Sequence, residues 1–127
     1  MGMNFRNVAV LAKTESTYGT DSTPVGTTDA MLVKGAQPQV YMGDRVSRDL
    51  QTGVLGAQSE LNVGPHAAIT FQVEIAGAGA AGTAPKYGPL LKACGMSETI
   101  SAGVSVTYAP VSSAFSSVTI YYFIDGQ

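Results

Sequence analysis

The sequence predicts a mainly β fold, a small β-sandwich or barrel subunit with one flanking α-helix at about residues 86–94. Three observations predict it. Residues 66–75 alternate between apolar and small or polar side chains, with the period of two of a half-buried strand. Several shorter apolar runs are separated by segments rich in Gly, Pro, Ser and Thr, which is typical of strands joined by turns. Only one short segment places apolar residues at helical spacing. The 127 residues suit one domain, so residues 1–127 are interpreted as a single unit.

The N-terminal part is expected to hold a short strand followed by a long loop. The apolar run Val8 to Ala12 predicts the strand. Residues 14–29 contain Thr, Ser, Gly, Asp and Pro in close succession and predict an extended loop or arm. Two further strands are expected at residues 30–34 and 40–50, separated by Pro38.

The middle of the chain contains the most regular pattern. Residues 52–59 are Gly-rich and predict a turn before a short strand at residues 60–63. In the long strand at residues 66–75, one face is wholly apolar and is expected to anchor the core. Its members are Ala67, Ile69, Phe71, Val73 and Ile75. The other face is small or polar and consists of His66, Ala68, Thr70, Gln72 and Glu74.

The C-terminal part is expected to contain the only real helix and two strands. A loop at residues 77–84 precedes Pro85, a residue favoured at the first position of a helix, and Gly95 is suited to the position just after its end. The closing strands are expected at residues 104–108 and 118–124, with a turn between them.

Composition excludes several classes of protein. Charged residues make up 13% of the chain, against about 25% in an average soluble domain, and the net charge is −2. A protein that grips nucleic acid normally carries a basic stripe, and the sequence has none. Because charged residues are few, Ser, Thr and Gly are expected to form much of the surface, and other subunits could cover this neutral surface. The only apolar run near the N-terminus is too short for a signal peptide or a membrane span, so no membrane partner is expected.

Chemistry-bearing residues are few. Gly77 to Gly82 match the GxGxxG pattern of dinucleotide-binding units, but Thr83, Ala84 and Pro85 intervene before the helix can start, so a mobile loop is the favoured interpretation. His66 is the sole histidine and is interpreted as a strand-end residue, while Cys94, the sole cysteine, is expected to be buried and inert on the helix stripe. A Ser-His-Asp triad or a Cys-His pair would have to be built around His66, and no nucleophile motif such as GxSxG is present. One His and one Cys also cannot make a Cys/His zinc site within one chain. No catalytic, cofactor or metal site is predicted, and the chain is interpreted as a non-enzyme.

Four charged residues on the expected 40–50 strand are candidates for contacts between subunits. Asp44 would share a strand face with Arg48, and Arg45 would share the other face with Asp49. Residues four apart on a strand lie about 13 Å from each other and cannot pair directly. They are either solvated charges or, in the sharper hypothesis, salt bridges to neighbouring subunits.

Four blocks of sequence resemble the tail tube proteins of long-tailed bacteriophages. The first is Ala-Lys-Thr-Glu-Ser-Thr-Tyr-Gly-Thr-Asp at residues 12–21, followed by Pro24. The second is Ala-Pro-Lys-Tyr-Gly-Pro-Leu-Leu-Lys-Ala-Cys-Gly at residues 84–95, and the others lie at residues 108–113 and 117–121. Together they run in order through nearly the whole chain. Members of the family often continue well beyond its end, so a shortened form, or the N-terminal part of a longer subunit, is one interpretation of this chain.

The resemblance implies a structural subunit that forms rings, expected to be hexameric, which stack into a tube for genome ejection. Its partners would be other copies, tape measure and tail terminator proteins, and phage DNA that passes through without specific binding. The subunit would reside in the virion tail after assembly in the host cytoplasm. Candidate subunit-interface residues are Tyr18, Asp21, Asp44, Arg45, Arg48 and Asp49. Candidate residues of the channel wall are Thr70, Gln72 and Glu74.

Two alternatives remain open from the sequence. A small virion-associated β-sandwich binding module for carbohydrate or host-surface proteins would need an exposed aromatic platform, and the chain contains no Trp. A nucleotide-dependent enzyme would need the glycine pattern to lie at the start of a helix.

Overall fold

The computed structural model describes residues 6–53 and 55–126. The fold is mainly β, with 48% strand and 8% helix, and its described strands form three small antiparallel sheets. The prediction of a mainly β chain is confirmed. The chain divides into two compact units, one built from the described parts of residues 1–34 and 72–127 and the other from residues 35–71.

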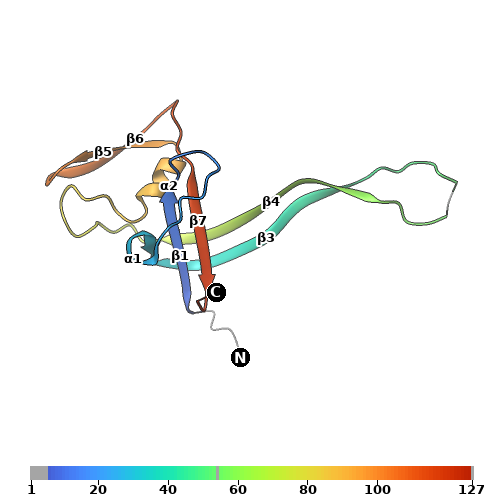
Figure 1. Cartoon of the computed structure of the whole chain (residues 1–127), viewed down its shortest axis with the longest axis horizontal. Coiled ribbons are helices and arrows are strands. Elements are labelled where there is room, and N and C mark those ends of the chain that lie inside the picture. The colour runs from blue at the N-terminus through green and yellow to red at the C-terminus, as the bar shows by residue number, and fades with distance from the viewer. Residues whose placement is uncertain (1–5, 54, 127) are drawn as a thin grey trace. The chain divides into compact units, whose positions relative to one another are not determined.

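The first sheet has the strand order β2-β1-β7 and contains the core. Its central strand β1 (Val8–Thr14) runs antiparallel to β7 (Val118–Ile124) along its whole length, and the two lie side by side in Figure 1. On its other side β1 pairs with the two-residue strand β2 (Ala30–Met31). The buried hydrophobic residues are Val10, Leu11, Ala12 and Met31. The strands predicted at residues 8–12 and 118–124 are therefore confirmed, and they form the structural centre of the larger unit.

A loop with one helical turn connects β1 to β2, much as the sequence predicts. The turn is α1 (Gly26–Asp29), in which the Asp29 carboxylate accepts a hydrogen bond from the Val25 backbone N–H at 2.7 Å. This bond satisfies a donor that the short helix itself leaves unpaired.

A β-hairpin and a short helix occupy the C-terminal half. Strands β5 (Met96–Ser101) and β6 (Ser105–Pro110) pair antiparallel, and β5 is a strand that the sequence interpretation missed. The helix predicted at residues 86–94 is shorter than expected: α2 (Gly88–Ala93) has six residues, and Pro89 rather than Pro85 lies in its first turn. The predicted stop is confirmed, since Gly95 adopts a φ of +83°, a conformation that glycine tolerates without strain.

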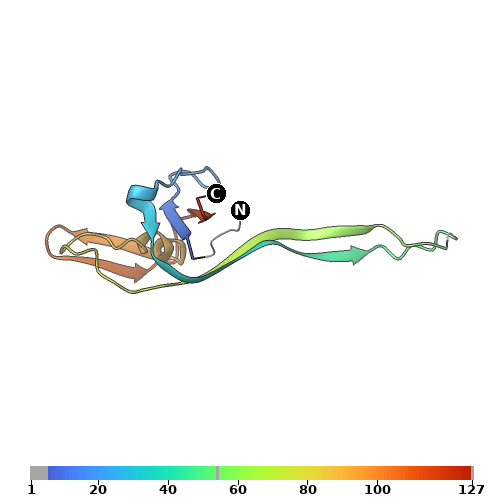
Figure 2. The same cartoon turned by 90° about the horizontal axis from the view of Figure 1, so that it is seen from below.

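The longest strands pair with each other in a two-stranded sheet. Strand β3 (Val33–Ser47) continues through Pro38, and β4 (Glu60–Val73) runs through residues 64–65, where the sequence had predicted interruptions. Proline is tolerated because each strand of a two-stranded ribbon has an edge that needs no N–H donor. Figure 2 shows the two strands as adjacent ribbons.

The expectation that β4 anchors the core is wrong. Ile69, Phe71 and Val73 are only partly covered, Ala67 is exposed, and Ile75 lies beyond the strand with 89% of its surface exposed. The two strands of this sheet cannot cover each other's faces, so an apolar face is buried only where another layer packs on it. None of the helices in the described ranges is long and apolar enough to cross a membrane.

Candidate functional site

The β3–β4 hairpin has two faces of different character. The Arg45 guanidinium lies 3.6 Å from the Glu60 carboxylate, so these two side chains share one face. Side chains alternate along a strand, and Tyr41 and Gly43 therefore lie on the Arg45 face, with Asn62 beside Glu60. The neighbouring positions in both strands must then lie on the opposite face.

That opposite face is apolar and exposed. We call it the apolar hairpin face, and its members are Val40, Met42, Val46, Leu61 and Val63, with exposed fractions of 85%, 38%, 50%, 53% and 51%. Asp44 lies among them by the same alternation and is also exposed. Contiguous exposed apolar residues on a small chain usually mark a surface that another molecule covers. A hairpin of two strands is also only marginally stable by itself in water.

The exposed apolar surface contrasts with the size of the core. Four hydrophobic residues are buried among those described, and no polar or charged residue is. Other large apolar side chains stay exposed, including Leu32 at 91% and Phe115 at 68%. Burial on this scale is small for a chain of this length, since a domain of about 150 residues normally buries more than two thirds of its surface.

The predicted charged quartet is only partly brought together. Arg45 finds its partner Glu60 within the same hairpin, whereas Arg48 and Asp49 lie beyond the end of β3 and so do not share strand faces with Asp44 and Arg45. Beyond the end of β3, the Gln58 side chain accepts a 2.6 Å hydrogen bond from the Leu50 N–H. Asp49 itself has a φ of +42°, a turn conformation that Asp accepts more readily than most residues.

The other predicted interface residues differ in their surroundings. Tyr18 is 90% exposed. Asp21 is engaged within its own chain, where its carboxylate accepts hydrogen bonds from the Thr23 N–H at 2.8 Å and from the Tyr121 hydroxyl.

The predicted channel-wall residues are all exposed. Thr70 and Gln72 lie on β4 and alternate with more covered neighbours, as the sequence pattern predicts. Glu74 lies one residue beyond the end of the strand, so its side chain is not fixed by the ladder of β4.

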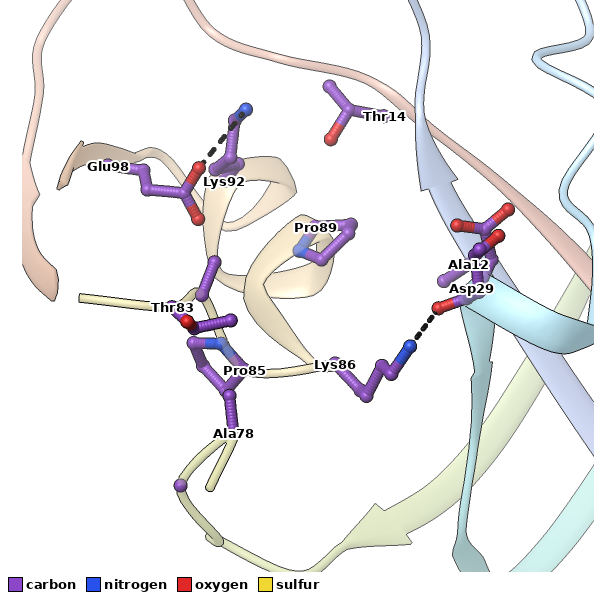
Figure 3. Close-up of a pocket in the computed structure, with 13 residues that line it drawn as sticks. Ala12, Thr14, Asp29, Ala78, Thr83, Pro85, Lys86, Pro89, Lys92 and Glu98 are labelled. Carbon is purple, nitrogen blue, oxygen red and sulfur yellow. Dashed lines mark hydrogen bonds and ion pairs between the residues drawn. The ribbon is translucent and has the colours of Figure 1, made fainter. Parts of the chain in front are cut away.

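An open cavity of about 640 Å³ lies between β1, α1, α2 and the segment that precedes α2 (Figure 3). Its two lysines are already engaged: Lys86 donates to the Thr28 carbonyl, and the Lys92 ammonium lies 3.9 Å from the Glu98 carboxylate. Asp29, also on its wall, accepts from Val25 as described above. Each charged side chain on the cavity wall thus has a polar partner within the chain, and Lys92 with Glu98 forms an ion pair. The described ranges hold no group of three or more His, Cys, Asp or Glu residues placed to bind a metal ion.

Gly82, the last glycine of the run at residues 77–82, has a packing role. A Cβ on Gly82 would lie 2.4 Å from the Gly103 N and 2.5 Å from the Ser101 carbonyl oxygen, so only glycine fits against the β5–β6 turn. As predicted, α2 does not begin within the glycines. Its first residue, Gly88, comes after Pro85.

The two isolated chemistry-bearing residues differ from expectation. Cys94 is exposed rather than buried, and it is the C-cap residue of α2, which ends at Ala93. His66 lies inside β4 rather than at a strand end, and its Nδ1 is 2.8 Å from the Gly64 carbonyl oxygen.

A cluster that sequence reasoning missed joins α2 to the β5–β6 hairpin. The Tyr108 hydroxyl donates a 2.5 Å hydrogen bond to the Glu98 carboxylate, on adjacent strands whose residues 98 and 108 are directly paired. Burial, together with the carboxylate, raises the pKa of Tyr108, so its hydroxyl remains a donor. Gly88 is buried directly against this pair. Detecting the cluster from sequence would have required recognising β5.

Comparison with protein-family models, with curated proteins and with solved structures gave no match.

Proposed function

We propose that this chain is a structural subunit of a bacteriophage tail tube, assembling into stacked, hexameric rings that form the conduit for genome ejection. The sequence resemblance supplies the family, and the exposed apolar hairpin face is the observation that carries the proposal. A chain with so few buried residues and such a face gains most of its remaining apolar burial by associating with copies of itself. In this proposal it is not an enzyme.

In a closed ring, the exposed surfaces of each subunit would become contacts with its neighbours. In a ring, each subunit contacts its neighbour through two different surfaces, so the apolar hairpin face of one copy would pack on another surface of the next. Strand β7 lies at the edge of its sheet, and such an edge can pair with a strand of another copy. A β-sandwich or barrel completed by neighbouring copies belongs to this proposal.

The charges near the hairpin suggest how copies could be aligned. Asp44 lies on the apolar hairpin face, and covering it without a partner would be costly. A cation from the neighbouring copy would offset that cost, and Arg48 is the candidate. This contact is one way to form the intersubunit salt bridges that the sequence suggests for the four charged residues, among which Arg45 is already paired in its own hairpin.

The channel wall is assigned to Thr70, Gln72 and Glu74. Duplex DNA carries one negative charge per about 1.7 Å, so a neutral or acidic wall lets it pass without binding. Tape measure and tail terminator proteins would be the other partners, in a virion tail assembled in the host cytoplasm.

Two adjacent residues of β4 provide the test. Leu61→Asp places a charge on the apolar hairpin face, whereas Asn62→Asp places the same charge on the opposite face as a matched control. Burying an unpaired carboxylate costs several kcal/mol, so Leu61→Asp should abolish assembly and Asn62→Asp should preserve it. Sedimentation velocity over a range of concentrations measures the outcome. Equal assembly by both variants would remove the hairpin face from the proposal.

A further inference from the structure

The segment at residues 15–23 is bound to one face of β7 through two carboxylates. The Glu15 carboxylate accepts hydrogen bonds from the hydroxyls of Ser117 at 2.6 Å and Thr119 at 3.0 Å. The Asp21 carboxylate accepts one from the Tyr121 hydroxyl. Thr119 and Tyr121 alternate along β7 and so lie on a single face of the strand, and Ser117 lies one residue before its start.

The same groups also hold the backbone of the segment. Glu15 accepts the Gly19 N–H at 2.9 Å, Asp21 accepts the Thr23 N–H at 2.8 Å, and the Thr119 hydroxyl oxygen accepts the Ser22 N–H at 3.2 Å. The two carboxylates therefore accept two of these backbone amides directly. The third amide is accepted by Thr119, whose hydroxyl donates to Glu15. In this structure the segment lies on the sheet of its own chain.

The electrostatic environment favours the ionised form of both carboxyl groups. Hydrogen bonds from Ser117, Gly19 and Thr119 lower the pKa of Glu15 below its ordinary value of 4.5, against smaller opposing effects of desolvation and of the Asp21 charge. The Tyr121 hydroxyl lowers the pKa of Asp21 below 3.8, and Asp21 in turn raises the pKa of Tyr121. Besides these three groups, Lys13 lies on the same face, because it is paired with Thr119.

We propose that residues 15–23 form a latch that covers the Thr119–Tyr121 face of β7 while Glu15 and Asp21 are ionised, and that opens when they are protonated. The inference does not depend on the proposed function, since every contact lies within one chain. Both carboxyl groups have lowered pKa values in the closed state, so the stabilisation is fully present above their ordinary values. It is lost as the pH falls through the lower values of the closed state. At neutral pH the latch is closed, and another molecule that binds this face must displace it.

Amide hydrogen exchange of the full chain, followed by NMR, tests the latch directly. The reporters are the amides of Gly19, Ser22 and Thr23, and the β1–β7 amides report on the fold. At pH 7, Glu15→Ala with Asp21→Ala should lower the protection factors of the reporters about tenfold or more, because hydrogen bonds to charged groups are being lost. The control Glu74→Ala removes an exposed carboxylate and should leave them unchanged.

A pH series on the unmodified chain completes the test. Between pH 6 and pH 3 the reporter protection factors should fall while the β1–β7 amides stay protected. Unchanged reporters in the double variant, with the sheet intact, would overturn the proposal. If the double variant fails to fold, Tyr121→Phe replaces it, and the Thr23 amide should then lose protection. An unchanged Thr23 amide in that variant would also overturn the latch.

Discussion

Gly88 packs so closely on Tyr108 that a side chain at this position must displace the tyrosine hydroxyl, and Gly88→Ala is the sharpest test of the packing between α2 and the β5–β6 hairpin. A Cβ at this residue would lie 2.5 Å from the Tyr108 hydroxyl and 3.1 Å from the Glu98 carboxylate. Real Cβ contacts are not this short, so the tyrosine must move. Its 2.5 Å hydrogen bond to Glu98 would then be weakened or lost.

The magnitude of the change in stability follows from two costs and one gain. Loss of a hydrogen bond to a charged group costs about 1.5–3 kcal/mol, and overpacking adds about 1–3 kcal/mol. Replacing glycine by alanine within a helix returns up to about 1 kcal/mol. The expected net loss in the free energy of unfolding is about 1.5 kcal/mol or more. At about 4 °C per kcal/mol for a chain of this length, the melting temperature should fall by roughly 6 °C or more.

A double-mutant cycle identifies the cause of that loss. Tyr108→Phe removes the hydroxyl that a Cβ at residue 88 would strike, so Gly88→Ala should cost less when combined with Tyr108→Phe than in the native chain. Thermal and urea unfolding of both single variants and the double variant measure the coupling. Additive effects, or a Gly88→Ala variant that is more stable than the native chain, would refute the reasoning.

Two further predictions concern the proposed assembly. Arg48→Glu should weaken assembly, and adding salt should lessen the difference from the native chain, because the change reverses an exposed charge next to the hairpin. Sedimentation at 50 and 500 mM salt, chosen to span about a twofold or greater change in screening length, measures this effect, and assembly that is indifferent to the substitution would dispose of the salt bridge. Glu74→Lys should leave tubes intact yet impair genome delivery, since repeated cations on the wall would bind DNA. Normal delivery by virions carrying Glu74→Lys would remove this residue from the channel wall.

The strand content was largely predictable from local patterns. The strands at residues 8–12 and 118–124 were found because their apolar runs are bounded by turn residues. Strand β5 was missed, because the segment Met96 to Ser101 is largely polar and gains its strand character only from its pairing with β6. Pro38 was interpreted as a break, although a two-stranded ribbon accommodates proline at its edge.

The candidate site shows where single-sequence reasoning stops. The alternation in β4 correctly separated Thr70 and Gln72 from more covered neighbours, but period alone cannot say whether a partner layer exists to cover the apolar side. The link from Glu15 to Ser117 and Thr119 spans about a hundred positions, and no local pattern encodes such a contact. Sequence placed Asp21 among interface residues, whereas the structure gives it a partner, Tyr121, in the same chain.

Negative-stain electron microscopy of the purified full chain tests the central claim most directly. The account predicts rings with a central channel, or tubes of stacked rings, at protein concentrations where the apolar hairpin face is covered by neighbouring copies. Single particles of monomer size at every concentration, with the β1–β7 sheet folded, would contradict it.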